Sequence, residues 1–211
     1  MIVLNVHALP RGEESRTRKL QRAFLDTLHA QRSNCKVVSL DLAAGYKALP
    51  AFDAWDIQAK YEMAYGDGSL DADAAVRWTA LTKLTDQLHR ASMVVISAPM
   101  WNLSIPWYLK RWLDAVVQAR LTFEYVDGQY RGLLTGRTGV LLTTRDSAFG
   151  EGSPLQPLDF QLPYLRTILG FMGIDPIHEV VAEPMMAQGI EAGEVALATA
   201  IERAQELARS L

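Results

Sequence analysis

The sequence is poor in cysteine, and neither sign of charge dominates it. Its single cysteine, Cys35, cannot form an internal disulfide bond, so a disulfide-stapled secreted domain is not expected. The 21 basic and 24 acidic residues leave a net charge of −3, which provides no electrostatic footprint for nucleic acid or for an anionic membrane. The sequence shows no secretory signal pattern and no apolar run of about 18 residues. We therefore expect a cytoplasmic protein.

The composition is that of an ordinary globular protein. Hydrophobic residues make up 49% of the chain and charged residues 21%, which is enough apolar material for a core and gives no signature of disorder. We find no internal repeat, low-complexity tract or interdomain linker. The sequence therefore predicts a single domain over residues 1–211.

Short apolar runs rich in β-branched residues alternate with helical patterns. Five runs are predicted strands: Ile2–Val6, Lys36–Leu40, Met93–Ala98, Gly139–Thr144 and Ile177–Ala182. The runs are continuous rather than alternating, as parallel strands covered on both faces require. Helical spacing of apolar residues covers about 15–31, 71–90, a stretch from 104, 157–172 and 191–211. This alternation predicts an α/β fold with a doubly wound parallel sheet, whose ligands bind at the carboxyl ends of strands.

Two stretches interrupt the alternation. Residues 49–70 are too long for a plain connection, and we expect them to help cover a site, because long loops are often lids. Within residues 121–134, Asp127-Gly128 lies between two short β-like runs. This dipeptide is a strong signal for a two-residue β-hairpin.

The loop after the first predicted strand has the features of a phosphate site. Ser15 and Thr17 place two hydroxyl groups at the start of the first helix, where free backbone N–H groups and the helix dipole attract anions. The loop matches neither GxGxxG nor GxxxxGK[ST], which favours a monophosphate over a pyrophosphate or triphosphate. The alternative is that Ser15 serves only as a helix N-cap.

A second candidate loop follows the third predicted strand. It reads Pro99-Met100-Trp101-Asn102-Leu103, and in a doubly wound sheet it lies beside the first loop. An aromatic loop there suits a flat ring such as an isoalloxazine, with Asn102 shaping the turn. The alternative is that Met100 and Trp101 are ordinary packing residues at a strand end.

Several motifs follow one another along essentially the whole chain. They are Ala98-Pro99-Met100-Trp101-Asn102, Leu109-Lys110, Leu113-Asp114, Leu121-Thr122-Phe123-Glu124-Tyr125, Gly132-Leu133-Leu134-Thr135-Gly136, Tyr164-Leu165 and Leu169-Gly170-Phe171-Met172-Gly173. Together these motifs resemble the FMN-dependent NADH azoreductase family, which belongs to the flavodoxin-like NAD(P)H quinone reductases.

The resemblance implies a flavodoxin-like α/β fold, doubly wound, with a five-stranded parallel sheet in the order 2-1-3-4-5 and helices on both faces. It implies a homodimer that binds FMN and uses NADH or NADPH as electron donor. Quinones and aromatic azo compounds are then reduced by ping-pong two-electron transfer. Transferred residue by residue, the cofactor-binding positions are His7, Ser15, Arg16, Thr17, Pro99, Met100, Trp101, Asn102, Leu103, Thr144, Arg145 and Asp146. For His7, a plain strand-end role is an equal alternative.

The loop after the fourth predicted strand departs from the family pattern. Where the family often has Ser-Arg-Gly-Gly, this chain has Thr144-Arg145-Asp146-Ser147. Loss of both glycines alters how closely the backbone can approach the flavin. Asp146 would also disfavour negative charge on the flavin, unless it turns away or pairs with Arg145.

Other functions have less support. A flavodoxin-type electron carrier that docks to redox proteins is the main alternative, but a net charge of −3 does not indicate a strongly acidic docking face. A hydrolase would need a nucleophile and base, and the chain lacks GxSxG. The histidines show no metal-ligand spacing with Cys35, so we expect no metal. The sequence identifies no catalytic acid or base, and Trp107, Tyr108 and Trp112 are assigned to packing, a dimer interface or a substrate pocket.

Overall fold

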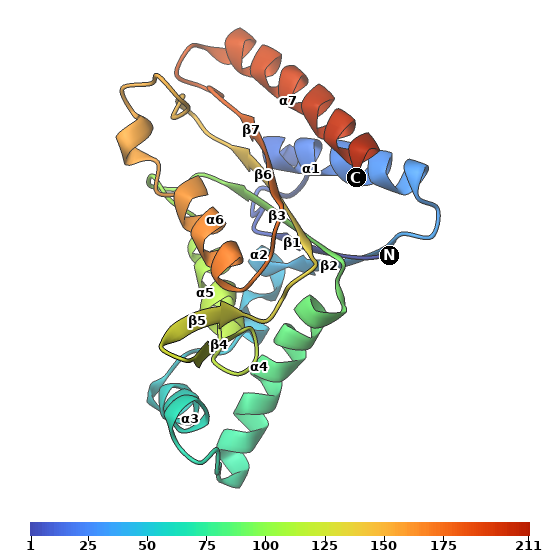
Figure 1. The fold of residues 1–211 in the computed structure, drawn as a ribbon. Helices are drawn as coiled ribbons and strands as arrows, with labels where there is room; N and C mark the ends of the chain where they lie inside the picture. Colours follow the sequence, from blue (N-terminus) through green and yellow to red (C-terminus); the bar gives the residue numbers. More distant parts are fainter.

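Five parallel strands form one sheet in a computed structural model that describes residues 1–211. The strands are β1 (Ile2–His7), β2 (Lys36–Asp41), β3 (Met93–Pro99), β6 (Thr138–Thr144) and β7 (Ile177–Ala182), in the order β2-β1-β3-β6-β7. All five predicted strands are confirmed, and the order corresponds to the predicted 2-1-3-4-5. Because every pair is parallel, the carboxyl ends of all five strands lie along one edge of the sheet (Figure 1).

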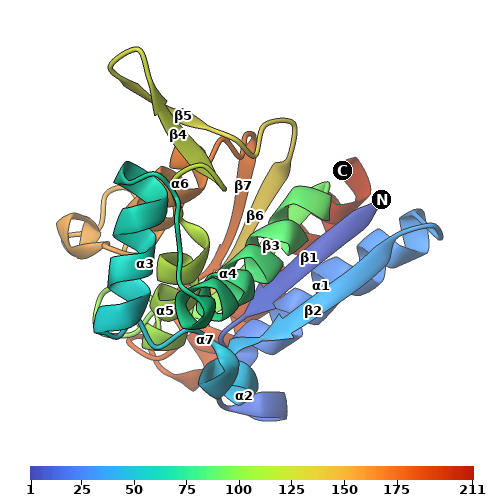
Figure 2. The same cartoon turned by 90° about the horizontal axis from the view of Figure 1, so that it is seen from below.

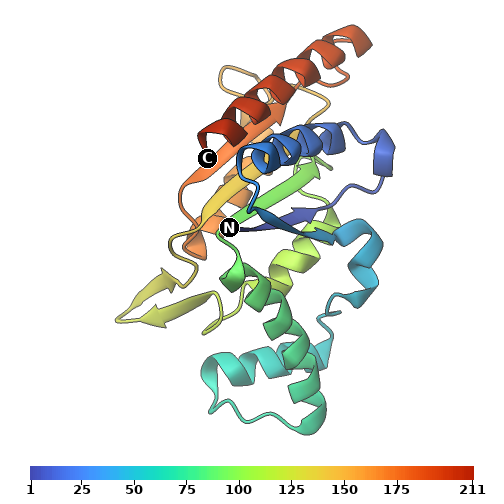
Figure 3. The same ribbon diagram turned by 90° about the vertical axis from the view of Figure 1, so that its right-hand side faces the viewer.

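Helices cover both faces of this sheet. On one face lie α1 (Arg16–Gln31) and α7 (Ile190–Ser210), and on the other lie α2 (Leu42–Gly45), α4 (Ala72–Arg90), α5 (Trp107–Val116) and α6 (Leu162–Phe171) (Figures 1 and 3). Successive strand residues face opposite sides, so Val95 packs under α1 and α7 whereas Ile96 packs under the other four helices. No helix combines the length and the apolar character needed to cross a membrane.

Three helices begin where a polar group can cap them or a turn ends. The Oγ of Ser15 accepts a hydrogen bond from the Arg18 N–H, so Ser15 is the N-cap of α1. Helix α5 begins at Trp107 rather than near residue 104, because residues 101–104 form a separate tight turn. Helix α6 begins at Leu162 rather than near residue 157. At this start, the Asp159 carboxylate accepts the Leu162 N–H at 3.1 Å.

The two interrupting stretches approach each other, because Ala64 and Tyr65 line one pocket with residues of the hairpin. The predicted hairpin is confirmed as β4 (Phe123–Val126) and β5 (Gln129–Gly132), and it projects from the main body (Figure 2). Asp127 and Gly128 both have positive φ, as the predicted turn requires. Residues 49–70 contain a helix, α3 (Ala54–Tyr65), which packs against α4.

Candidate active site

The loops that follow β1, β3 and β6 converge at the carboxyl edge of the sheet. They enclose a small cavity of about 230 Å³. This small cavity is lined by Pro10, Arg11, Ser15, Arg16, Thr17, Pro99, Met100, Trp101, Thr144, Asp146 and Met185. Eight of the twelve positions predicted from the sequence therefore lie around one space.

The first turn of α1 forms one wall of the small cavity. Its N-cap, Ser15, leaves the Arg16 and Thr17 N–H groups without an acceptor in the chain, as is usual at a helix start. These donors lie at the positive end of the helix dipole. Ser15 is thus both an N-cap and a lining residue, so the two interpretations of this residue do not exclude each other.

A hydrogen bond between two hydroxyl groups ties the first loop to the end of β6. Thr17 Oγ1 and Thr144 Oγ1 are 2.7 Å apart, and both side chains are buried. Two hydroxyl groups carry two protons, and their mutual hydrogen bond uses one of them. The other proton remains available to a ligand in the small cavity.

Two arginines and one aspartate set the charge of the small cavity. Arg11 is exposed, and its side chain makes no hydrogen bond or ion pair within the chain. The Arg16 guanidinium already has partners within the chain. It donates to the Met185 carbonyl at 3.1 Å and lies 3.5 Å from a Glu194 carboxylate oxygen. Asp146 is the one acidic lining residue against these two arginines, so the lining carries a net positive charge, which favours an anion.

A tight turn places the aromatic side chain that follows β3. Trp101 and Ser104 exchange two backbone hydrogen bonds of 3.0 and 2.9 Å. Between them, Asn102 has φ 47° and Leu103 has φ 68°. Asparagine tolerates this left-handed region, whereas for leucine it costs about 1–2 kcal/mol. Asn102 therefore shapes this turn as predicted, and strain at Leu103 is retained beside the cavity.

A larger cavity of about 620 Å³ adjoins the small one, and Trp101 lines both. It lies between the turn, α5 and the start of α6. Its lining consists of Trp101, Asn102, Ser104, Ile105, Trp107, Lys110, Asp159, Phe160, Pro163 and Tyr164. Four aromatic side chains give this larger cavity flat apolar walls, which suit a planar aromatic ligand.

Two titratable side chains of the larger cavity have shifted pKa values. Burial raises the pKa of the Tyr164 hydroxyl, so it remains protonated at neutral pH. Burial opposes the charge of Lys110, but a 2.6 Å hydrogen bond to Asp114 and the charge of that carboxylate outweigh it, and the pKa of Lys110 is raised. The larger cavity thus offers one neutral donor and one cation.

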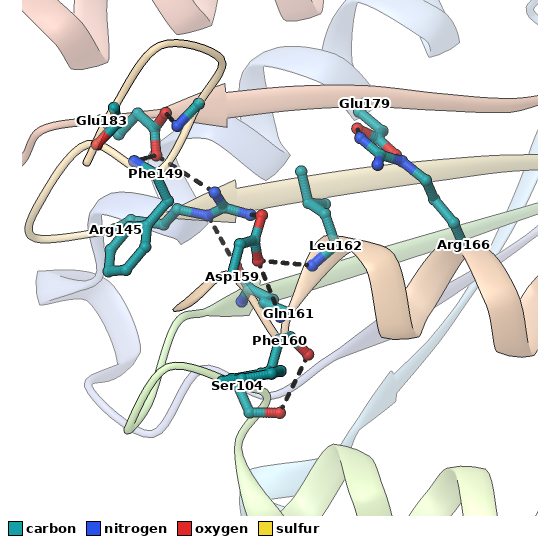
Figure 4. A network of polar contacts seen from close by, with 12 residues as sticks. Ser104, Arg145, Phe149, Asp159, Phe160, Gln161, Leu162, Arg166, Glu179 and Glu183 are labelled. Atoms are coloured by element: carbon teal, nitrogen blue, oxygen red, sulfur yellow. Dashed lines mark hydrogen bonds and ion pairs between the residues drawn. The ribbon is translucent and has the colours of Figure 1, made fainter. Parts of the chain in front are cut away.

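Arg145 points away from both cavities, although its neighbours in sequence line the small one. Its side chain is 1% exposed and binds Asp159, Glu183 and Gln161 (Figure 4). Arg145 makes no ion pair with Asp146. The Asp146 carboxylate in the small cavity is therefore not neutralised by Arg145, a pairing that the sequence had left open.

The remaining predicted positions lie outside the small cavity. Asn102 lines the larger cavity, whereas the side chains of His7 and Leu103 line neither. His7 is buried under α1 with Nδ1 3.9 Å from an Asp41 carboxylate oxygen, and burial lowers the pKa of its imidazole. No residue of 49–70 lines either cavity. Within a single chain this segment therefore does not cover the candidate site, and the expectation that it does is wrong.

Three residues that line the small cavity were not among the predicted positions: Pro10, Arg11 and Met185. Arg11 lies within the predicted phosphate loop, and its neighbours Pro10 and Gly12 indicate an exposed turn, so it could have been included. Met185 reaches the small cavity because its N–H donates to the Arg145 carbonyl at 2.8 Å. No pattern in the sequence near residue 185 indicates that contact.

Comparison with known proteins agrees with this geometry. The family model described as "Flavodoxin-like fold" matches residues 1–208. An "FMN-dependent NADH:quinone oxidoreductase" of Nitratidesulfovibrio vulgaris (strain DP4) is 37% identical, with 98% of this chain and 97% of that protein covered. An "FMN-dependent NADH:quinone oxidoreductase 2" of Pseudomonas syringae pv. tomato is 34% identical, with coverage of 100% and 99%.

A solved structure supports the same grouping. The azoreductase from Bacillus anthracis str. Sterne superposes with a TM-score of 0.89 at 29% identity, and both chains are covered completely. The predicted resemblance is therefore confirmed. The chain belongs to the flavodoxin-like-fold family, within the group that contains the FMN-dependent NADH:quinone oxidoreductases and azoreductases.

Proposed function

We propose that this chain is an FMN-dependent NAD(P)H oxidoreductase that reduces quinones and aromatic azo compounds by ping-pong two-electron transfer. One observation carries the proposal. A small, donor-rich cavity with net positive charge opens beside a larger aromatic cavity, and Trp101 is part of both walls. The names of the N. vulgaris and P. syringae relatives agree with this activity.

The residues of the small cavity fit the phosphate of FMN. A phosphate monoester needs several hydrogen-bond donors and a positive field, and both come from the free N–H groups of α1, the Thr17–Thr144 pair and Arg11. The lining around Pro99 and Met100 would then contact the ring edge of the cofactor. Of the predicted binding residues, Arg145, His7 and Leu103 would act through backbone or neighbouring groups.

The residues of the larger cavity fit the donor and the acceptor in turn. When bound, FMN supplies the two-electron chemistry, while the protein supplies orientation and a hydrogen-bonding environment. Trp107 and Phe160 provide flat surfaces for a nicotinamide, quinone or azo ring. Tyr164 keeps its proton at neutral pH and can therefore donate a hydrogen bond to a carbonyl oxygen or an azo nitrogen.

The proposal extends to the assembly. We expect one doubly wound, flavodoxin-like domain over residues 1–211, which works as a cytoplasmic homodimer. Trp107 is 47% exposed and Phe160 is 56% exposed beside the larger cavity, so a second copy that covers them would complete its walls. Sedimentation should show a dimer at micromolar concentration, and a fully active monomer would contradict this part.

The test of function is a visible absorption spectrum of the purified protein supplied with FMN. A flavin spectrum that bleaches on anaerobic addition of NADH or NADPH, and returns with a quinone or an azo dye, is expected. Adding the two nucleotides separately also decides which one is the donor. A bound flavin that neither nucleotide bleaches would favour the electron carrier, and a protein that binds no FMN would end both proposals.

A further inference from the structure

A buried arginine connects the walls of the two cavities. Arg145 follows β6 directly, and its three side-chain nitrogens each donate to a different residue (Figure 4). Nη2 lies 2.9 Å from Asp159 Oδ2, Nη1 lies 3.3 Å from Glu183 Oε2, and Nε lies 3.1 Å from Gln161 Oε1. The guanidinium carbon of Arg145 lies over the Phe149 ring, 5.7 Å from the ring centroid.

On one side, the network supports the loop that carries Asp146. The Glu183 carboxylate accepts the N–H groups of Phe149 at 3.0 Å and Gly150 at 2.9 Å. The Asp146 carbonyl accepts two further N–H groups from the segment that follows Glu183. The Arg145–Glu183 ion pair thus holds together the loops that follow β6 and β7, which both border the small cavity.

On the other side, the network supports the wall of the larger cavity. The second oxygen of Asp159 accepts the N–H groups of Gln161 and Leu162, so the same carboxylate binds Arg145 and starts α6. Gln161 Nε2 donates to the Ala98 carbonyl at 3.4 Å. Phe160 lies between Asp159 and Gln161 in the sequence, and its N–H donates to the Leu103 carbonyl at 3.0 Å. This bond attaches the wall to the tight turn.

We propose that Arg145 is a positioning residue that couples the two cavities: through Glu183 it holds the Asp146 loop, and through Asp159 it holds the wall that carries Phe160. A guanidinium presents its donors in a rigid planar fork, so it can satisfy three acceptors in three directions at once. A lysine ammonium also has three donors, but they share one nitrogen, which cannot stand at the three positions that Nε, Nη1 and Nη2 of Arg145 occupy. The inference rests on the proposed function for its ligands, but the contacts themselves exist without any ligand.

The first test is hydrogen exchange of the apoprotein, which needs no cofactor. In Arg145→Lys, the amides of residues 146–150 and of residues 160–162 should both exchange faster than in the parent. Glu183→Gln should accelerate only residues 146–150, and Asp159→Asn only residues 160–162. Asparagine at 159 keeps an oxygen for the α6 cap and removes the ion pair, so it isolates the contact with Arg145.

The second test uses the ligands. Loosening one wall is expected to change affinity roughly tenfold, which corresponds to about 1.4 kcal/mol. Glu183→Gln should raise the dissociation constant of FMN, Asp159→Asn should raise the KM for a quinone, and Arg145→Lys should raise both. If Arg145→Lys does not fold, the other two variants still test the two halves separately.

A matched control is Arg166→Gln, which removes the exposed ion pair between Arg166 of α6 and Glu179 of β7. Exposed pairs contribute little, so neither exchange at the two segments nor either affinity should change. If Arg145→Lys lowers only thermal stability, or changes one cavity without the other, the coupling role is refuted. If the parent binds no FMN, the proposed function fails while the exchange test still decides the positioning role.

Discussion

The hydroxyl pair Thr17–Thr144 allows a test in which stability and affinity move in different directions. Replacing one threonine by valine preserves volume but leaves the partner hydroxyl buried without its hydrogen bond. An unpaired buried hydroxyl costs about 1–3 kcal/mol of unfolding free energy, whereas replacing both partners with apolar groups of the same shape is nearly neutral. In the apoprotein, the double valine variant should therefore be more stable than either single variant.

The affinity for FMN should follow another order. Each single variant keeps one hydroxyl, and therefore one proton, facing the small cavity. The double variant keeps none. Loss of a hydrogen bond to a charged phosphate costs about 1.5–3 kcal/mol, which corresponds to a dissociation constant raised roughly 10- to 150-fold. The double variant should thus be a stable protein with the weakest FMN binding of the set.

Urea unfolding of the apoproteins and fluorescence titration with FMN measure the two quantities. The control is Thr143→Val: this neighbouring threonine is buried, its Oγ1 has no partner, and its side chain lies on the opposite face of the sheet. It should keep the parent's FMN affinity. A double variant at positions 17 and 144 that binds FMN as tightly as the parent would refute the phosphate assignment.

Three further predictions concern other residues. Replacing Asp146 and Ser147 by glycine should shift the two-electron potential of the bound flavin positive, by about 30 mV for each 1.4 kcal/mol of repulsion removed; dye equilibration that shows no positive shift would contradict it. Burial lowers the pKa of His7 from 6.5, so the unfolded chain takes up the proton first and stability falls as pH drops below that value. His7→Gln should reduce this acid-side loss in unfolding experiments, and an unchanged pH profile would count against the assignment. Gly132→Ala would place a Cβ 2.2 Å from the Gly173 backbone nitrogen and should lower urea stability by about 1–3 kcal/mol or more; a parent-like midpoint would contradict that close approach.

Sequence patterns predicted the small cavity well because its parts are tied to strand ends. The residues after β1 and β3 were placed together from strand order, since parallel strands end at a common edge, and those after β6 were added from the family resemblance. The same reasoning cannot assign side-chain direction once a strand has ended. Arg145 is one residue past β6, and its side chain turns into the protein, where it pairs with Asp159 and Glu183. Both acceptors come from segments whose sequence carries no signal for that contact.

Long connections were the least predictable part. Residues 49–70 were expected to cover a site on the basis of length, but their helix packs against α4 with Met63 near Trp78 and Leu81. The apolar residues of α3 do not form one clear stripe, since only Asp56 and Ala59 are buried. A pattern this weak is decided by its tertiary neighbours, which a sequence reading does not supply.

The Thr17–Thr144 contact also bears on how the protein is made in the cell. The two residues are 127 positions apart, and Met185 completes the small cavity later still in the chain. A nascent chain therefore has no nucleotide site until nearly all of it has left the ribosome. FMN can bind only the finished fold, and at 100 times its dissociation constant it would add about 2.7 kcal/mol to native stability by mass action. The abundance of this protein should consequently follow the supply of flavin, because the cofactor-free form is the one that opens more often to proteases.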